Sequence, residues 1–269
     1  MQPDSISHGA VKTEAQHRND ICTVGRWIHD RGFVASTDGN VSVRLGADRI
    51  LMSPTCMSKG MMTPDDLVII DLDGRRIDGS RKPSSELGMH LLIYRLRPDV
   101  NAICHAHPPT ATGFAAAGIA LDKPILCELI LGLGSIPVAR YGTPGTSELT
   151  AALEPLVRGH ESILMANHGV VTYGADLLTA FLRMETTEHF ARVSLVTELL
   201  GKQVLLSGGD VEKLVAARAR YAAGAQPVSP ASSEDLSNGS SSATDRVTLT
   251  RRELDALIDE AVRRDRSLR

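Results

Sequence analysis

The sequence has few aromatic residues, no excess of basic charge and no long apolar run. Phe, Trp and Tyr make up only 3% of the 269 residues, whereas apolar residues reach 42%, so a core must consist mainly of aliphatic side chains. The net charge of −3, with both signs interspersed, argues against a nucleic-acid-binding protein, which typically has a basic face. Because no stretch of about 18 apolar residues occurs, we also expect no membrane-spanning helix.

Cysteine is scarce as well, and its arrangement argues against a protein held together by disulfides. The four cysteines form no CxxC pair and match no common disulfide framework: Cys22, Cys56, Cys104 and Cys127. Residues 1–16 are polar and lack the apolar segment of a secretory signal. We therefore expect a cytoplasmic protein with reduced, buried thiols.

The pattern of apolar residues predicts helices and short strands in a mixed order. Helices are expected at residues 11–31, 85–97, 110–117, 148–156, 175–200 and 211–221. Strands are expected at residues 41–45, 50–53, 67–72, 100–107, 125–130, 136–141, 163–166 and 170–172. This mixture favours an α/β or α+β sheet covered by helices over a regular βαβ repeat.

A change of composition near residue 224 divides the chain into three parts. Residues 1–224 carry the alternating helices and strands, and residues 225–247 form a Ser/Pro/Gly-rich linker that we expect to be flexible. Residues 248–269 contain the spacing of a helical capping box, followed by apolar residues that recur on one helical face. The C-terminal part is therefore expected to be a short amphipathic helix on a tether.

Two histidines separated by one residue indicate a metal site. Because side chains alternate along a strand, His105 and His107 lie on one face of the predicted strand, while Cys104 points to the other face. His168 follows an apolar strand in a predicted turn, and Glu86 begins a predicted helix. Three imidazoles and a carboxylate suit Zn²⁺. The alternative, solvated or core-bonded histidines, stays open at this point.

Small polar loops beside the predicted strands provide a possible anion site. Asp38 to Ser42, Ser53 to Thr55, and the pair Ser84 and Ser85 combine hydroxyls, exposed N–H groups and a helix start, which together favour a phosphate. The same residue types also form turns and helix caps without any ligand. His90, one turn after Glu86, is expected to be a packed helix residue, with a partner of a metal ligand as the alternative.

Taken together, these segments resemble the class II aldolase/adducin family, in the pattern of its L-fuculose-1-phosphate aldolases. They occur in the order of that family over residues 12–222. The matching segments are Thr37 to Ser42, Ser53 to Thr55, Lys82 to Glu86, Arg97 to Asp99, His105 to His107, Tyr141 to Thr146 and Asn167 to Gly169.

The resemblance implies a fold and a set of site residues. The fold would be a three-layer α/β/α sandwich with a mixed, mainly antiparallel central sheet, and the enzyme a homotetramer. Zinc would be bound by His105, His107, His168 and Glu86, with Glu86 also catalytic, and Tyr221 would help to close the site. The substrate phosphate would be held by Thr37, Gly39, Asn40, Thr55, Cys56, Ser84 and Ser85, where Cys56 replaces a common glycine.

The resemblance also implies cleavage of a ketose 1-phosphate, such as L-fuculose 1-phosphate, into dihydroxyacetone phosphate and an aldehyde such as lactaldehyde. One departure is the absence of the family's acid tyrosine, since Glu128 or Leu129 occupies its place. A different acid, a water molecule or a different substrate would account for it. The alternatives are a sugar-phosphate 4-epimerase, a decarboxylase, a dehydratase, or an adducin-like scaffold without catalysis.

The C-terminal segment resembles a second known type of sequence. A short amphipathic helix on a Ser/Pro/Gly linker is similar to the encapsulation peptides that carry enzymes into the lumen of bacterial microcompartments, some of which degrade fucose. The resemblance implies that residues 248–269 bind a shell protein, since a detached amphipathic helix needs an apolar partner. Oligomerisation and binding at a membrane surface are the alternatives, the latter disfavoured by both charge signs on the polar face.

Overall fold

The computed structural model describes the backbone of residues 12–224 and the side chains of residues 12–218. The chain divides into two units, residues 1–220 and residues 221–269, and the first contains every element except the last turn of the final helix. The predicted linker, 225–247, and the predicted amphipathic helix, 248–269, lie outside the described residues. No helix of the described part is long and apolar enough to cross a membrane.

A single eight-stranded sheet forms the centre of the first unit, with the strand order β4-β3-β2-β1-β5-β8-β7-β6. All neighbouring strands are antiparallel except β6 and β7, which are parallel. The expected mixed, mainly antiparallel sheet is confirmed. Its strands are β1 (Asn40–Arg44), β2 (Arg49–Met52), β3 (Val68–Asp71), β4 (Arg76–Asp78), β5 (Ala102–Ala106), β6 (Val138–Ala139), β7 (Ser162–Met165) and β8 (Gly169–Gly174).

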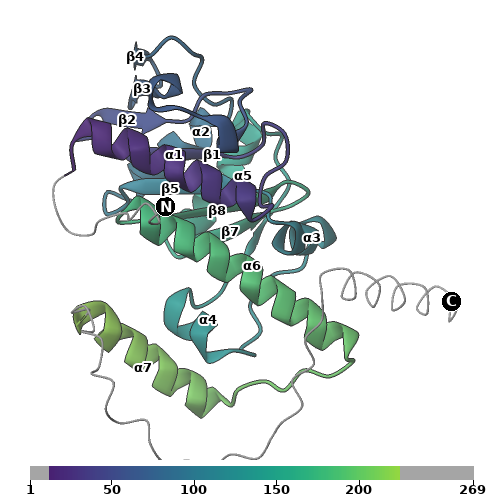
Figure 1. Ribbon diagram of the computed structural model, residues 1–269. Helices are drawn as coiled ribbons and strands as arrows, with labels where there is room; N and C mark the ends of the chain where they lie inside the picture. The colour runs from purple at the N-terminus through teal and green to yellow at the C-terminus, as the bar shows by residue number, and fades with distance from the viewer. Residues whose placement is uncertain (1–11, 225–269) are drawn as a thin grey trace, which may run out of the picture. The chain divides into compact units, whose positions relative to one another are not determined.

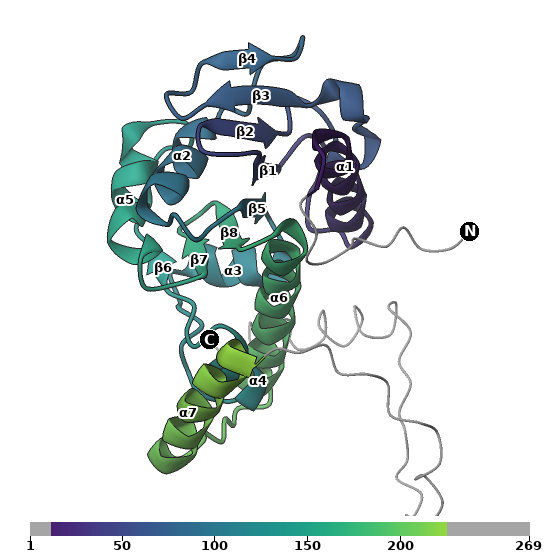
Figure 2. The ribbon, with the colours of Figure 1, turned by 90° about the vertical axis from the view of Figure 1, so that its left-hand side faces the viewer.

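Helices cover both faces of this sheet, so the predicted α/β/α sandwich is confirmed. Figure 2 shows α2 and α5 on one side of the strands and α1 and α6 on the other, and α3 packs against α6. Two 3₁₀ turns, Lys59–Met61 and Pro64–Asp66, follow β2. The helices (Figure 1) are α1 (Glu14–Asp30), α2 (Leu87–Leu96), α3 (Pro109–Ala117), α4 (Cys127–Gly132), α5 (Ser147–Val157), α6 (Leu177–Leu199) and α7 (Gly208–Gly224).

The alternation of side chains along β5 places one face of the strand in each of two hydrophobic cores. Ala102, Cys104 and Ala106 are fully buried in the core that includes α1, α3 and α6. Ile103 is buried in the other core, with α2 and α5. His105 is on the same face as Ile103, because residues two apart point the same way. The expectation that Cys104 belongs to the core is therefore confirmed, and His105 faces the start of α2.

Two sequence-based assignments are wrong for identifiable reasons. Residues 125–130 were expected to be a strand, but Cys127–Gly132 is the helix α4. Its buried Leu129, Ile130 and Leu133 have helical spacing, which becomes visible only when the apolar pattern is followed beyond residue 130. The strand β4 was not predicted, because all three of its residues are exposed and show no apolar alternation.

The cysteines follow the expectation only in part. All four thiols are free, and Cys22 and Cys104 are buried as expected. Cys56 and Cys127 are exposed, so the expectation of buried thiols is wrong for these two. Cys56 has a left-handed backbone conformation, with φ = 55°, which places it in a turn rather than in the core.

Candidate metal centre and phosphate pocket

Three neighbouring strands bring the predicted site residues to one edge of the sheet. The carboxyl end of β5 carries His105 and leads directly to His107. Because β1 and β8 are both antiparallel to β5, the start of β1 and the β7–β8 turn with His168 lie at this same edge. Glu86 occupies the N-cap position of α2, which packs on the face to which His105 points. The antiparallel pairing thus collects residues that are distant in sequence.

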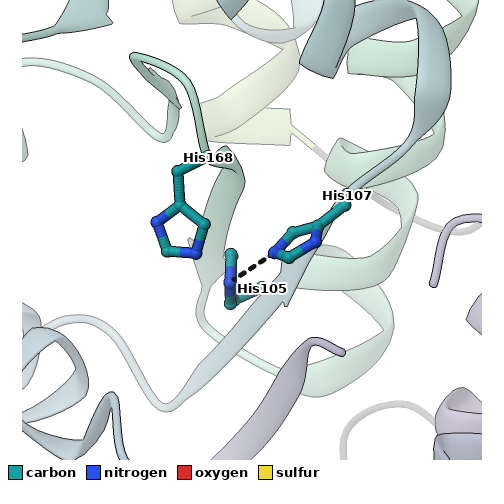
Figure 3. A group of neighbouring side chains, drawn as sticks. All are labelled: His105, His107 and His168. Atoms are coloured by element: carbon teal, nitrogen blue, oxygen red, sulfur yellow. Dashed lines mark hydrogen bonds between the residues drawn. The ribbon is translucent and has the colours of Figure 1, made fainter. Parts of the chain in front are cut away.

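The three imidazoles converge on a single point. Figure 3 shows His105, His107 and His168 with their rings turned toward one another. One nitrogen from each ring lies within 4.8 Å of the others, and the ring centroids are 4.9–5.1 Å apart. The His105 side chain is fully buried, and those of His107 and His168 are 26% and 10% exposed. A small ligand could therefore reach the cluster from the side of His107.

Glu86 completes the cluster as its carboxylate. Its Oε2 lies 3.0 Å from Nε2 of His105 and its Oε1 lies 3.2 Å from Nε2 of His168. The Nε2 atoms of His105 and His107 are 3.2 Å apart. The structure thus brings together all four residues predicted as metal ligands, with their ligating atoms facing one another.

The donor set fits a zinc ion. Ligating nitrogens must carry a free lone pair, and His105 meets this condition because its Nδ1 donates to the carbonyl of Val170 at 2.8 Å, which leaves Nε2 unprotonated. Oε1 of Glu86 is buried without a hydrogen-bond partner among the described residues. Unprotonated nitrogens in close contact repel each other unless a cation lies between them. Three nitrogens and one oxygen are a common ligand set for Zn²⁺.

The electrostatics of the cluster agree with this assignment. Burial, followed by the proximity of His105, which would repel a second protonated ring, lowers the pKa values of His107 and His168 to about 4, so both rings are neutral at pH 7 as metal ligands must be. Burial alone would raise the pKa of Glu86, but His105 and His168 outweigh it and the pKa falls well below its usual range. Glu86 is therefore a carboxylate, and its charge raises the pKa of His105 against the effect of burial.

Asp38 is a site residue that the sequence analysis did not assign a role. Its Oδ2 lies 3.4 Å from Nδ1 of His107, on the side of the ring that faces away from the cluster. A carboxylate on the second nitrogen orients a ligating imidazole and increases its basicity. Asp38 lies within the quoted segment Thr37 to Ser42, but nothing in its sequence neighbours distinguishes this contact from an ordinary turn aspartate.

A chain of hydrogen bonds runs from Glu86 into the interior between the sheet and α2. Asn40 donates to Oε2 of Glu86 at 2.8 Å, and its own carbonyl oxygen lies 2.5 Å from Nε2 of His90. Nδ1 of His90 is 2.6 Å from the Ser42 hydroxyl, which is 2.8 Å from the Tyr94 hydroxyl. Burial lowers the pKa of His90 to about 3, so the ring is neutral and can donate on one side and accept on the other.

His90 is thus the packed helix residue that was expected, and it also belongs to the hydrogen-bond chain that ends at Glu86. It is fully buried, and it reaches Glu86 through the single intermediate Asn40. The spacing of four residues between Glu86 and His90 was the only sequence feature that pointed to this role.

A pocket of about 310 Å³ adjoins the histidines. It is lined by hydroxyls and backbone from three loops, together with Glu86, His107 and His168. All seven residues expected to hold a phosphate line this pocket: Thr37, Gly39, Asn40, Thr55, Cys56, Ser84 and Ser85. The loops thus place a polar, hydroxyl-rich surface directly beside the histidine cluster.

Two glycines allow the backbone to approach this closely. A Cβ on Gly169 would lie 2.5 Å from Cδ2 of His107 and 2.7 Å from the carbonyl of Ala106. Gly39 has φ = 72°, and a Cβ there would lie 2.7 Å from the carbonyl of His105. Any side chain at either position would displace the strand end that carries the ligands.

Glu128, Leu129 and Tyr221 are the residues that were expected near the reacting end of a substrate. Leu129 is buried in the hydrophobic core and Glu128 is exposed on α4. Neither is among the described residues that line the pocket. Tyr221 lies in the last turn of α7, and its side chain is outside the described residues, so its role stays a prediction.

Comparison with families of known proteins gives a match over most of the folded part. Residues 19–195 match the model of the family described as Class II Aldolase and Adducin N-terminal domain. The chain is 35% identical over 202 residues to the 5-deoxy-D-ribulose 1-phosphate aldolase of Bacillus thuringiensis serovar kurstaki, covering 74% of this chain and 93% of the relative. It is also 31% identical over 186 residues to the 3-oxo-tetronate 4-phosphate decarboxylase of Haemophilus influenzae, covering 67% and 88%.

A solved structure supports the same relationship. The structure of an L-fuculose 1-phosphate aldolase superposes with a TM-score of 0.71 at 27% sequence identity. The match covers 78% of this chain and 99% of that protein. The similarity therefore extends over most of this chain.

Proposed function

Since the chain belongs to the family of class II aldolases and adducin N-terminal domains, we propose that it is a zinc-dependent aldolase that cleaves a ketose 1-phosphate. The products would be dihydroxyacetone phosphate and a small aldehyde such as lactaldehyde. The single observation that carries this proposal is the position of the histidine cluster and Glu86 beside the hydroxyl-lined pocket. One small substrate could then place its carbonyl end at the metal and its phosphate end in the pocket.

Each part of the site has a task in such a reaction. His105, His107, His168 and Glu86 would hold the Zn²⁺, which when bound supplies Lewis-acid stabilisation of the charge on the ketose oxygens. The loops around the pocket would bind the phosphate and orient the carbon chain.

Glu86 would move the proton once the substrate displaces it from the ion. Asn40 holds its Oε2, whereas its Oε1 has no hydrogen-bond partner among the described residues and would then be able to accept a proton. In the cleavage, the hydroxyl at C4 loses its proton, the C3–C4 bond breaks, and its electron pair moves to the C2 carbonyl to give an enediolate. A proton returned to C3 then gives dihydroxyacetone phosphate.

The names of the relatives favour a deoxyketose 1-phosphate as the substrate. One relative is named for 5-deoxy-D-ribulose 1-phosphate, and the similar solved structure is an L-fuculose 1-phosphate aldolase. Both compounds share a ketose 1-phosphate head and end in a methyl group. A decarboxylase is the second candidate, because a relative at 31% identity is named 3-oxo-tetronate 4-phosphate decarboxylase. An epimerase, a dehydratase and a non-catalytic scaffold are weaker alternatives.

Product analysis of the purified, metal-loaded protein tests this proposal. We expect dihydroxyacetone phosphate from L-fuculose 1-phosphate or 5-deoxy-D-ribulose 1-phosphate, measured through a coupled dehydrogenase, and condensation of dihydroxyacetone phosphate with lactaldehyde in reverse. Release of CO₂ from 3-oxo-tetronate 4-phosphate without aldol cleavage would favour the decarboxylase instead. A protein that retains no divalent metal by elemental analysis and turns over none of these substrates would contradict both and favour a scaffold.

We also propose that the protein is a homotetramer with Tyr221 near each site. Exposed apolar side chains at the end of α6 and in the following segment support an assembly, since such patches usually mark interfaces. Leu199, Leu200, Val204 and Leu205 are 52–75% exposed. Light scattering gives the mass in solution, and a monomeric, fully active protein would contradict the proposal. Tyr221→Phe tests the tyrosine, with a loss of turnover expected at unchanged metal content.

For the C-terminal segment, the proposal is binding to a microcompartment shell protein, which would place the enzyme in the compartment lumen. Its support is the amphipathic pattern of residues 248–269 after the Ser/Pro/Gly-rich segment. Deletion of residues 248–269 should leave aldolase activity unchanged and abolish co-purification with shells. Equal co-purification of the truncated and full-length proteins would rule out this role.

A further inference from the structure

Lys59 is a lysine in an unusual environment. Its side chain is almost fully buried, with 1% of the residue exposed, although lysine is rarely buried without a partner that compensates its charge. It belongs to the 3₁₀ turn after β2, outside every segment that the sequence analysis marked as functional. The mechanism proposed above does not use it.

The hydrogen bonds of the Lys59 ammonium join the two loops that form one side of the pocket. Its Nζ donates to the carbonyl of Thr37 at 3.0 Å and also to the carbonyl of Met57. Thr37 lines the pocket, and Met57 directly follows Cys56, which lines it as well. Both acceptors are neutral backbone carbonyls. The ammonium charge is therefore not neutralised by a carboxylate at these two hydrogen bonds.

The pocket itself offers no positive side chain. Over the described residues, its lining contains hydroxyls, backbone, two imidazoles and carboxylates, but neither Lys nor Arg. A phosphate monoester carries close to two negative charges at pH 7. A dianion bound beside Glu86 and Asp38 needs a compensating charge, and the buried ammonium is the cation that the chain places against the pocket loops.

We propose that Lys59 is the cationic group of the phosphate pocket, which joins the loops of residues 36–40 and 53–57 and supplies the positive charge for a phosphate monoester. This inference rests on the proposed function. Lys59 is a positioning residue, since it acts through the two loops and through its field rather than by a contact in the pocket. A charge in a region from which water is excluded acts more strongly than an exposed one.

The charge state of Lys59 provides a test that a purely structural role would not pass. Burial lowers its pKa to about 8, while Asp38 and Cys56 act in the opposite direction. The titratable groups facing it are these two, from the pocket loops, and His29 of α1, whose ring lies against Gly60. The ammonium is thus present at pH 7 and is lost as the pH rises through about 8, whereas a phosphate monoester, with a second pKa of about 6, stays a dianion.

The experiment measures the affinity of the zinc-loaded, full-length protein for glycerol 3-phosphate by calorimetry between about pH 7 and pH 9.5. Lys59→Gln keeps an N–H donor but removes the charge, and Lys59→Met removes both. Lys82→Gln is the matched control, because Lys82 is an exposed lysine close to the pocket whose side chain does not line it. Cys56→Ser tests whether the thiol in the pocket contributes to any change of affinity with pH.

At about pH 7, we expect both Lys59 variants to bind glycerol 3-phosphate at least about tenfold more weakly, and Lys82→Gln to change the affinity less than about twofold. The wild-type protein should lose this affinity as the pH rises through about 8, whereas Lys59→Gln should show a flat profile. Should the Lys59 variants not fold, the wild-type and Cys56→Ser profiles still decide the matter.

Three results would overturn the inference. They are a Lys59→Gln protein with wild-type affinity and pH profile, a wild-type affinity that does not fall up to about pH 9.5, and a fall that disappears in Cys56→Ser. In each case glycerol 3-phosphate still binds, so the proposed function stands. A zinc-loaded wild-type protein that does not bind the phosphate ester at any pH would instead contradict the phosphate pocket, and this inference with it.

Discussion

The histidine cluster and the phosphate pocket lie side by side but are built from different kinds of structure. The ligands come from the end of the central strand β5, the β7–β8 turn and the N-cap of α2, and all are at least half-buried. The pocket residues come from irregular loops, and several of them, such as Thr37, Cys56 and Ser85, are exposed. Strand pairing thus positions the candidate metal ligands, whereas the buried Lys59 joins two of the pocket loops.

Among the substitutions considered, removal of one candidate ligand should have the largest effect on metal binding and turnover. In His107→Ala, the cluster loses one of three nitrogens, so we expect loss of bound metal and of turnover to the detection limit, while phosphate-ester binding persists. Elemental analysis measures the bound metal, an activity assay measures turnover, and calorimetry measures phosphate-ester binding. His160→Ala, a change outside the cluster, is the control. An active, metal-free His107→Ala protein would refute the metal centre.

The second-largest effect is expected when a candidate ligand is displaced but not removed, and it should appear in the metal affinity. In Gly169→Ala, the new Cβ would lie 2.5 Å from the His107 ring, so the ring or the turn must move. We expect metal affinity to fall by about 100-fold or more, since misplaced ligands bind poorly. Gly159→Ala is the matched control, because no atom lies within 4 Å of the added Cβ. Wild-type metal affinity in Gly169→Ala would show that the strand ends are less rigid than their pairing implies.

A smaller effect is expected from the hydrogen-bond chain behind Glu86. His90→Leu leaves Asn40 and Ser42 without their partner, so the Glu86 carboxylate loses its orientation. We expect kcat to fall about 10- to 100-fold with metal retained. Tyr94→Phe removes only the far end of the chain and should reduce kcat by less than about threefold. Equal effects of the two substitutions on kcat would argue against an ordered chain that ends at Glu86.

The smallest expected effect concerns the backbone of the pocket loop. Cys56 has φ = 55°, a conformation that costs a non-glycine residue about 1 kcal/mol or more. Cys56→Gly removes this cost but loosens the unfolded chain, so we expect a gain in stability of at most about 1 kcal/mol. Thermal unfolding measures it, with Cys127→Ser as the control for loss of an exposed thiol. Destabilisation of more than about 1 kcal/mol would show that the thiol itself stabilises the loop.

The sequence predicted well those helices and strands whose apolar residues recur at regular spacing. The helices α1, α2, α5 and α6 and the strands of the sheet centre follow directly from their apolar spacing. The segment of α4 was misassigned because a short apolar run fits either a strand or a helix. The exposed strand β4 has no buried face, so only its pairing with β3 makes it a strand.

The candidate site was predictable in its residue types but not in its supporting contacts. The alternation along β5 indicated that His105 and His107 share a face. A turn after an apolar strand and a helix start indicated His168 and Glu86 as partners, and the resemblance to known aldolases implies the same four residues. Nothing in the sequence indicated that Asp38 contacts His107, or that Lys59 joins two loops. Asp38 and His107 are 69 positions apart and Lys59 and Thr37 are 22 apart, and no local periodicity encodes contacts over such separations.

The aliphatic core, the periodic elements, the four candidate ligands and the hydroxyl-rich loops could thus be inferred from the sequence. Only the tertiary structure decided that these ligands share one centre, that the loops surround one pocket, and that a lysine is buried behind it. The physical reason is that periodicity is a property of neighbouring residues, whereas convergence depends on the antiparallel order of β1, β5 and β8.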